Sequence, residues 1–239
     1  MSVSVIIPTF NRFKYLLNAI ESVRNQTKKP EQIIVVNDGS TQSEYYTHDF
    51  GNDITLIHLS KNSKEILGQK SPGGIQRNIG LQIATGEYIA FLDDDDYWLP
   101  TKLEKQIKKM KETNIDFSTT EGLFGNGPYD KNKTYKKYLT EHTINELRKI
   151  FFLKGWLLQD FPQIWNKTLF YIHNCALASA VVVKKDLILS VGGFKLISFA
   201  DDYECWLRII EKTDCLFLDE PLVYIDGNHG DGRQYETHF

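Results

Sequence analysis

Four consecutive aspartates, Asp93 to Asp96, are the strongest candidate for chemistry in this sequence. They directly follow an apolar run that ends at Leu92, and four adjacent carboxylates repel one another. A hard divalent cation such as Mg²⁺ or Mn²⁺ would relieve that repulsion and could bind a diphosphate at the same time. An acidic N-cap for the next helix, or a structural Ca²⁺ loop, would also explain the run. The four residues alone therefore leave a metal site and a structural role open.

Asp38 and Arg77 each have one ordinary and one functional interpretation. Asp38 follows a predicted strand and precedes Gly39, as turn residues commonly do. If it lies beside the aspartate run, its oxygens could instead bind a base edge or a ribose. Arg77 belongs to a glycine-containing segment, residues 73–80, and is either a solvated helix charge or a cation that faces a nucleotide.

Asp201, Asp202 and His229 are the remaining candidates. The two aspartates stand where a helix is predicted to begin, and the helix dipole favours acidic residues there. A carboxylate in a partly enclosed pocket could instead act as a general base toward an acceptor hydroxyl. His229 lies in the glycine-rich segment 227–233, where it is either a metal ligand or a lone surface histidine.

The first hundred residues alternate short apolar runs with helical patterns. This alternation predicts a parallel, Rossmann-like sheet with helices on both faces. The predicted strands are residues 3–7, 33–36, 54–59 and 87–92, and the predicted helices are residues 13–23, with Asn11 as its N-cap, and 75–84. Ligands bind beyond the carboxyl ends of such strands, and those ends carry residues 8–11, Asp38 and the aspartate run. The candidates should therefore converge on one rim of the sheet.

The second half of the chain has a different pattern. It predicts helices at 101–113, 144–153 and 202–212, a strand at 176–183, and a strand followed by a loop within 114–130. No linker, repeat or low-complexity segment interrupts it. We therefore expect a single domain over residues 1–239, with a donor half at about 1–100 and an acceptor half at about 101–239.

Composition narrows the class of protein. The 239 residues are 41% hydrophobic, enough for one substantial core, and the net charge of -3 argues against a nucleic-acid partner. Three cysteines without CxxC spacing predict neither a disulfide framework nor a zinc site, as expected for a cytoplasmic protein. The N-terminus lacks the pattern of a signal peptide, and no apolar stretch is long enough to span a bilayer. Peripheral association with the inner face of a membrane stays open.

The ordered set of motifs resembles the family 2 glycosyltransferases of GT-A fold. The resemblance covers roughly residues 3–230 and rests on the following segments: VIIPTFN from Val5, VVNDGST from Val35, GEYIAFLDDDD from Gly86, GGF from Gly192 and DDYECWLR from Asp201. It implies an α/β fold of the nucleotide-diphospho-sugar transferase type, with a mainly parallel central sheet flanked by helices.

The resemblance also implies roles for single residues. Donor binding falls to Pro8, Thr9, Phe10, Asn11, Asp38, Arg77, Asp93 and Asp94, with the nucleobase, usually uracil, held by Pro8 to Phe10 and Asp38. Asp95 is the implied ligand of Mn²⁺ or Mg²⁺, within the family's DXD motif, and His229 is a further one. Asp202 is the implied general base. Because the family's Glu-Asp motif is here Asp201-Asp202, the choice between the two carboxylates stays open.

The activity implied by the resemblance is an inverting transfer of a sugar from a nucleotide diphosphate, with UDP as the expected nucleotide. The acceptor would be a hydroxyl of a glycan or lipid-linked molecule, in the synthesis of surface polysaccharide or glycoconjugate. The Gln-x-x-Arg-Trp motif of processive members is absent, which argues against a polymerising synthase. Two alternatives stay open: a polyprenyl-phosphate glycosyltransferase, whose acceptor needs no strong base, and a non-catalytic sugar-nucleotide-binding domain.

Overall fold

The computed structural model describes residues 1–68, 73–153 and 161–230. The strands are β1 (Val3–Thr9), β2 (Gln32–Asn37), β3 (Ile54–His58), β4 (Tyr88–Phe91), β5 (Tyr97–Trp98), β6 (Phe117–Gly125), β7 (Lys136–Lys137), β8 (Ile164–Trp165), β9 (Val182–Lys184) and β10 (Cys215–Asp226). The α-helices are α1 (Phe13–Arg24), α2 (Glu44–Thr47), α3 (Ser63–Leu67), α4 (Gly74–Ile83), α5 (Lys102–Thr113), α6 (Ile144–Leu153), α7 (Lys167–Phe170), α8 (Lys185–Ser190) and α9 (Asp201–Ile210). A π-helical segment, Tyr138–Thr143, precedes α6, and a 3₁₀ turn, Ala178–Ala180, precedes β9.

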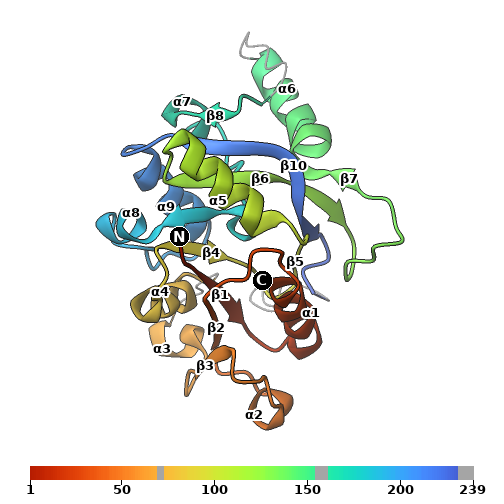
Figure 1. Ribbon diagram of the computed structural model, residues 1–239, viewed down its shortest axis with the longest axis vertical. Coiled ribbons are helices and arrows are strands. Elements are labelled where there is room, and N and C mark those ends of the chain that lie inside the picture. Colours follow the sequence, from red (N-terminus) through yellow and green to blue (C-terminus); the bar gives the residue numbers. More distant parts are fainter. Residues whose placement is uncertain (69–72, 154–160, 231–239) are drawn as a thin grey trace.

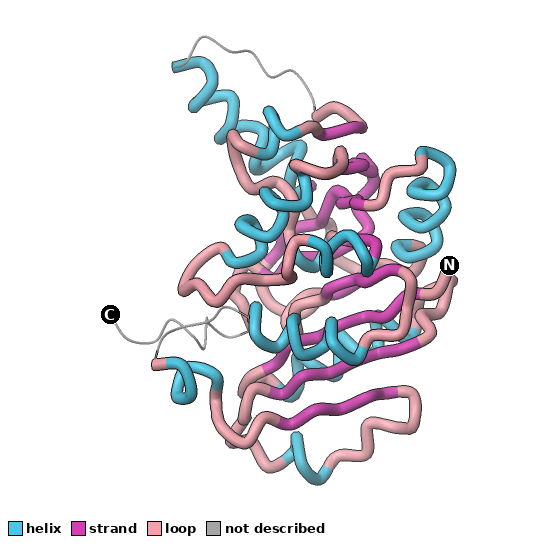
Figure 2. The backbone as a smooth tube through the Cα atoms, turned by 90° about the vertical axis from the view of Figure 1, so that its left-hand side faces the viewer, coloured by secondary structure: helices cyan, strands magenta, loops and turns pink. Residues whose placement is uncertain are grey.

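One sheet runs through the described parts of both halves, in the order β3-β2-β1-β4-β9-β6-β10-β5 (Figure 2). The pairs β3–β2, β2–β1, β1–β4 and β6–β10 are parallel, while β9 pairs antiparallel with both β4 and β6. All strands of four residues or more therefore run in one direction, and their carboxyl ends share one rim. The α/β fold with a mainly parallel sheet, predicted from the alternating pattern, is confirmed. Figure 1 shows α2 and β3 at one end of the molecule and α6 at the other.

Successive side chains along the parallel strands point to opposite faces of the sheet, and each face packs into a hydrophobic core. Val5 of β1 and Ile33 of β2 face a cluster that includes α1 and α5, whereas Ile6 and Ile34 face a second cluster that includes α4 and α9. All four side chains are at least 95% buried. A strand covered on both faces has to be apolar at every position, which is why these runs were recognisable in the sequence.

Three details of the predicted elements are wrong. α1 begins at Phe13 after Arg12, and Asn11 is not its cap: Asn11 has φ 53°, and its Oδ1 accepts a hydrogen bond from the Thr41 backbone N–H at 2.8 Å. The predicted strand at 176–183 contains instead the 3₁₀ turn and the short β9. The long strand β10 was not predicted, because Asp219-Glu220-Pro221 interrupts its apolar pattern, and the pairing with β6 shifts register there.

No described helix has the length and apolar character that crossing a bilayer requires. The three cysteines, Cys175, Cys205 and Cys215, are free and buried.

Candidate active site

The rim of the sheet collects the ends of β1, β2, β4 and β10 together with the start of α9. This arrangement brings the aspartate run to the same edge as Asp201 and His229. The strand pattern predicted this edge for the aspartate run but not for the other two residues. The four aspartates do not point to a common centre, however. Among the described residues no group of three or more histidine, cysteine or acidic side chains is arranged to hold a metal ion.

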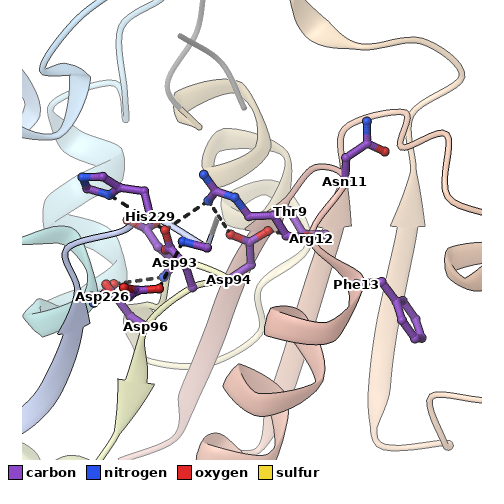
Figure 3. Close-up of polar contacts among 12 residues, drawn as sticks. Thr9, Asn11, Arg12, Phe13, Asp93, Asp94, Asp96, Asp226 and His229 are labelled. Carbon is purple, nitrogen blue, oxygen red and sulfur yellow. Dashed lines mark hydrogen bonds and ion pairs between the residues drawn. The ribbon is translucent and has the colours of Figure 1, made fainter. Parts of the chain in front are cut away.

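Arg12 is the cation around which the middle of the aspartate run is arranged (Figure 3). Its Nη1 donates to Asp94 Oδ1 at 3.0 Å and to Asp95 Oδ2 at 3.2 Å, and its side chain is only 9% exposed. The hydroxyl of Thr9 donates to Asp94 Oδ2 at 2.7 Å. The arginine therefore relieves part of the repulsion between the aspartates, a role that the sequence analysis gave to a metal ion. Sequence reasoning did not assign Arg12 a role, although it directly follows the motif that ends at Asn11.

The carboxyl group of Asp95 has a raised pKa in spite of its contact with Arg12. Burial, and next the adjacent Asp94, raise the pKa of Asp95 to about 8, although Arg12 acts in the opposite direction. His229 Nδ1 lies 3.9 Å from Asp95 Oδ2, and the imidazole is 38% exposed. One oxygen and one nitrogen ligand thus face each other at the edge of the site. This pair fits a small divalent cation, since Mg²⁺ is commonly bound by one or two carboxylates together with substrate phosphates.

Asp226, at the end of β10, holds the segment that carries His229. Its Oδ1 accepts hydrogen bonds from the backbone N–H groups of Gly127 (2.7 Å) and Asn228 (2.9 Å), and its Oδ2 accepts one from Gly230 (3.1 Å). Its own N–H donates to Asp96 Oδ1 at 3.1 Å (Figure 3). Asp226 is fully buried and was missed from the sequence because its strand was missed. Of the glycine-rich segment around His229, residues 231–233 lie outside the described part of the chain.

Arg77 joins the aspartate run to the start of α9. Its Nη2 donates to Asp93 Oδ1 at 2.6 Å, and its Nη1 lies 3.7 Å from Asp201 Oδ2. Burial lowers the pKa of this guanidinium, but the charges of Asp93, Asp201 and Asp202 outweigh burial and leave the pKa raised. Arg77 is 4% exposed. It is therefore a charged residue within the site rather than a solvated helix charge.

Asp201 and Asp202 have different surroundings. Asp201 is 2% exposed and faces Arg77 and α4, and burial raises its pKa to about 6. Asp202 is partly exposed, and burial raises its pKa as well, with Arg77 acting in the opposite direction. Its Oδ1 accepts a hydrogen bond from the Tyr203 N–H at 2.7 Å. Of the two residues, Asp202 is the more exposed one.

Asp38 lies at the end of β2 with both carboxylate oxygens occupied. Oδ2 accepts from Asn62 Nδ2 (3.0 Å) and from the Ser63 hydroxyl (2.8 Å), and Oδ1 accepts from the Ser63 N–H (2.8 Å). The residue is fully buried, and burial raises its pKa. In this arrangement Asp38 fastens the start of α3 to the rim. That contact spans 25 residues, and no motif or periodicity predicts it.

The other donor-site candidates lie together on the β1–α1 connection. Pro8 and Thr9 are buried, and Phe10 and Asn11 are half-buried. The Asn11 N–H donates to the Ser40 hydroxyl at 2.9 Å, which ties this connection to the end of β2. The ends of the two strands therefore form one continuous surface beside the aspartates.

Comparison with known proteins agrees with this architecture. The sequence profile described as Glycosyl transferase family 2 matches residues 4–187, about three quarters of the chain. The chain belongs to glycosyl transferase family 2. The resemblance proposed from the motifs is thereby confirmed.

Relatives in the family include proteins of different length. An uncharacterised glycosyltransferase of Rickettsia conorii is 40% identical over 225 residues, which cover 92% of this chain and 32% of that protein. The Escherichia coli protein WfaP is 32% identical over 214 residues, 88% of this chain and 70% of its own length. WfaP is named as a UDP-Glc:alpha-D-GlcNAc-diphosphoundecaprenol beta-1,3-glucosyltransferase. The chain spans only 16–32% of the length of three Rickettsia relatives.

A solved structure supports the fold. Staphylococcus aureus TarS, residues 1–349, in complex with UDP-GlcNAc, superposes with a TM-score of 0.70 at 20% identity. The match covers all of this chain and 62% of that one. At this level of identity the likeness bears on the fold alone, and it agrees with the predicted GT-A architecture.

Proposed function

We propose that this family 2 domain is an inverting glycosyltransferase that uses a nucleotide-diphosphate sugar, with UDP as the nucleotide. The observation that carries the proposal is the pairing, on one rim, of the Asp95–His229 edge with the partly exposed Asp202. Arg77, between Asp93 and Asp201, links the two. Family membership supplies the class of reaction, and this geometry supplies groups for both ends of the transfer.

The donor diphosphate is assigned to the Asp95–His229 edge. These two residues would hold Mn²⁺ or Mg²⁺, which when bound supplies positive charge that stabilises the departing diphosphate. The nucleoside would extend along the ends of β1 and β2, across residues 8–11 toward Asp38. UDP is favoured because WfaP is named for a UDP-glucose reaction, and TarS was solved with UDP-GlcNAc.

Asp202 is assigned as the general base. Because its pKa is raised by burial, its carboxylate is a stronger proton acceptor than an ordinary aspartate. It would accept the proton of the acceptor hydroxyl as that oxygen forms a bond to the anomeric carbon. The bond to the diphosphate breaks on the opposite side, and the departing group retains the electron pair. Attack from that side inverts the anomeric configuration in a single displacement.

Arg77 and Asp201 support this step without acting on the substrate. Burial raises the pKa of Asp202, and the Arg77 guanidinium acts in the opposite direction by favouring the ionised form that accepts a proton. Asp201 lies 3.7 Å from the same guanidinium and helps to fix its position. Because Asp202 is partly exposed and Asp201 is buried against Arg77, Asp202 is preferred as the base.

A lipid-linked glycan acceptor, in glycoconjugate synthesis at the cytoplasmic face of a membrane, is the expected context. It rests on the name of WfaP, whose acceptor is a diphosphoundecaprenol-linked sugar. We further assign residues 1–239 to one catalytic domain, with the donor bound by about residues 1–100 and the acceptor by about residues 101–239.

The test is transfer from UDP-glucose to a lipid-linked N-acetylglucosamine diphosphate, with Asp202→Asn compared with Asp186→Asn. Asp186 is an exposed carboxylate in the first turn of α8, so it controls for loss of charge at a helix start. We expect Asp202→Asn to lower kcat by about 10²–10⁴ and to leave UDP affinity unchanged. Retained activity in Asp202→Asn would favour the polyprenyl-phosphate alternative. UDP binding without turnover of any sugar would favour the non-catalytic one.

A further inference from the structure

A cavity of about 360 Å³ lies next to the aspartate run on the α1 side of the rim. Its walls come from α1, from Asp95 to Tyr97, and from the loop at residues 128–132. α1 packs on the face of the sheet opposite to α9, which carries the proposed base. The cavity is therefore separate from the place where the acceptor hydroxyl would react.

Tyrosine rings fix one wall of this cavity. The rings of Tyr97 and Tyr129 stack with centroids 4.8 Å apart and an interplanar angle of 22°. Tyr129 also packs against Tyr224, whose hydroxyl donates to the Gly127 carbonyl at 2.6 Å. The Asp130 N–H donates to the Tyr135 hydroxyl at 2.9 Å. The loop is thus held from both ends, and the cavity is formed before any ligand arrives, as small-molecule sites usually are.

The polar groups around the cavity are available to a ligand. The side chains of Asn18, Glu21 and Lys131 line it, and none makes a hydrogen bond or ion pair with another described residue. An amide, a carboxylate and an ammonium group thus offer both donors and acceptors beside aromatic surface. A ligand with many hydroxyl groups and an apolar ring face would satisfy both kinds of surface.

The charge of the lining decides between classes of ligand. Away from the Asp95–His229 edge, Glu21 and Asp130 contribute carboxyl groups, and Lys131 is the single cationic side chain among the lining residues. A phosphate or diphosphate in this part of the cavity would meet one ammonium group beside two carboxylates, which disfavours an anion. The lining therefore favours a neutral ring over a phosphate group.

From these observations we infer that the cavity is a saccharide subsite that binds a neutral sugar unit of the acceptor glycan. The inference rests on the proposed function, because the transferase would have to hold an acceptor beyond the reacting hydroxyl. The same chemistry would suit the sugar of the donor, so the experiment has to separate these two sources.

The experiment follows backbone amide NMR shifts while N-acetylglucosamine or glucose is added to the full chain saturated with UDP in the presence of Mg²⁺. We expect shifts at Tyr129 and Asn132, and a loss of sugar affinity of at least about fivefold in Asn18→Ala, as for removal of one hydrogen bond. Lys14→Ala, an exposed change on the same helix that does not line the cavity, should bind sugar like the wild type. Alanine favours helix, so neither change should disturb α1.

Three outcomes would overturn the inference. The first is no shift in the cavity with either sugar, and the second is equal affinity in Asn18→Ala and the wild type. In the third, Asn18→Ala weakens the binding of UDP-glucose but not the binding of UDP, which would assign the cavity to the donor sugar. UDP binding measured in the same samples keeps the two proposals apart. Sugar binding without UDP binding would refute the proposed function, and the reverse would refute only this subsite.

Discussion

Replacing Asp226 by asparagine should loosen two loops at once. The carboxylate receives three backbone N–H groups, from Gly127, Asn228 and Gly230, which belong to connections about 100 residues apart in the sequence. Asparagine keeps one acceptor oxygen and replaces the other by a donor. If the remaining oxygen serves Gly127 and Asn228, the new amide group faces the Gly230 N–H, and two donors then oppose each other in a buried place.

The magnitude follows from these three bonds. Hydrogen bonds to a charged group contribute about 1.5–3 kcal/mol each, against about 0.5–1.5 kcal/mol for neutral ones. The substitution removes one charged bond and weakens two others by about 1 kcal/mol each, which gives an upper bound of about 4–5 kcal/mol. Relaxation of the two loops around the new amide group offsets part of this. We expect a net loss of about 2–3 kcal/mol, which lowers the Tm of a chain of this size by roughly 4–12 °C.

The assay is urea unfolding of Asp226→Asn beside Asp130→Asn. Asp130 also accepts a backbone N–H, that of Asn132 at 2.9 Å, but in an exposed turn, so its change should cost at most about 0.5 kcal/mol. Asp226→Asn should in addition weaken Mn²⁺-dependent UDP binding, because His229 is no longer held. Equal stabilities of the two variants, or a loss below about 0.5 kcal/mol for Asp226→Asn, would refute the reasoning.

Three further predictions concern the carboxylates Asp201 and Asp202 and one close contact between α4 and β1. The pKa of Asp201 is about 6 in the folded protein, above its value of about 3.9 in the unfolded chain. The protonated side chain therefore stabilises the fold fully below about pH 3.9, and this contribution is lost as the pH rises through 6. In urea unfolding, the free energy of unfolding of Asp201→Asn should therefore rise relative to that of the wild type by about 2–3 kcal/mol between pH 4 and pH 8. A difference between the two proteins that does not change with pH would contradict this. Because the pKa of Asp202 is raised, the kcat profile should fall on the acid side at a pH above the ordinary aspartate range; a rate that stays constant into that range excludes Asp202 as the base. Gly80→Ala should lose about 1–3 kcal/mol, because the new Cβ would lie 2.5 Å from Ile6 Cγ2, whereas Gly122→Ala, with its closest neighbour at 3.4 Å, should be nearly neutral in the same thermal unfolding assay.

The parallel half of the fold could be predicted because each element is determined locally. β1, β2 and β4 are buried on both faces, so their residues form continuous apolar runs that stop at polar turns. β10 has no such continuous apolar run, because Asp219-Glu220-Pro221 lies within it, and its partner β6 is about 100 residues earlier. The 3₁₀ turn at residues 178–180 was missed for a related reason. There the Ser179 hydroxyl accepts the Asp93 N–H and its carbonyl accepts the Trp98 indole N–H, both more than 80 residues away.

The site was predicted as a set of residues but not as a set of contacts. The predicted parallel strands placed residues 8–11, Asp38 and the aspartate run on one rim, whereas the roles of Asp202 and His229 were implied by the resemblance alone. The sequence could not show that Arg12 shares its charge between two aspartates, or that Asp226 anchors the segment of His229. Arg12 lies more than 80 residues before the two aspartates, and Asp226 belongs to the strand that was missed. Neither contact carries a periodic signal. The roles of the donor-site residues stay predictions.

The most direct test of the central claim is calorimetric titration of UDP into the wild type and Asp95→Ala, each with and without Mn²⁺. We predict that UDP binds the wild type only when Mn²⁺ is present. Loss of Asp95 should weaken that binding by more than the roughly 10–100-fold typical of outer-shell changes at metal sites. UDP binding of equal affinity in all four titrations would contradict the assignment of the diphosphate to the Asp95–His229 edge.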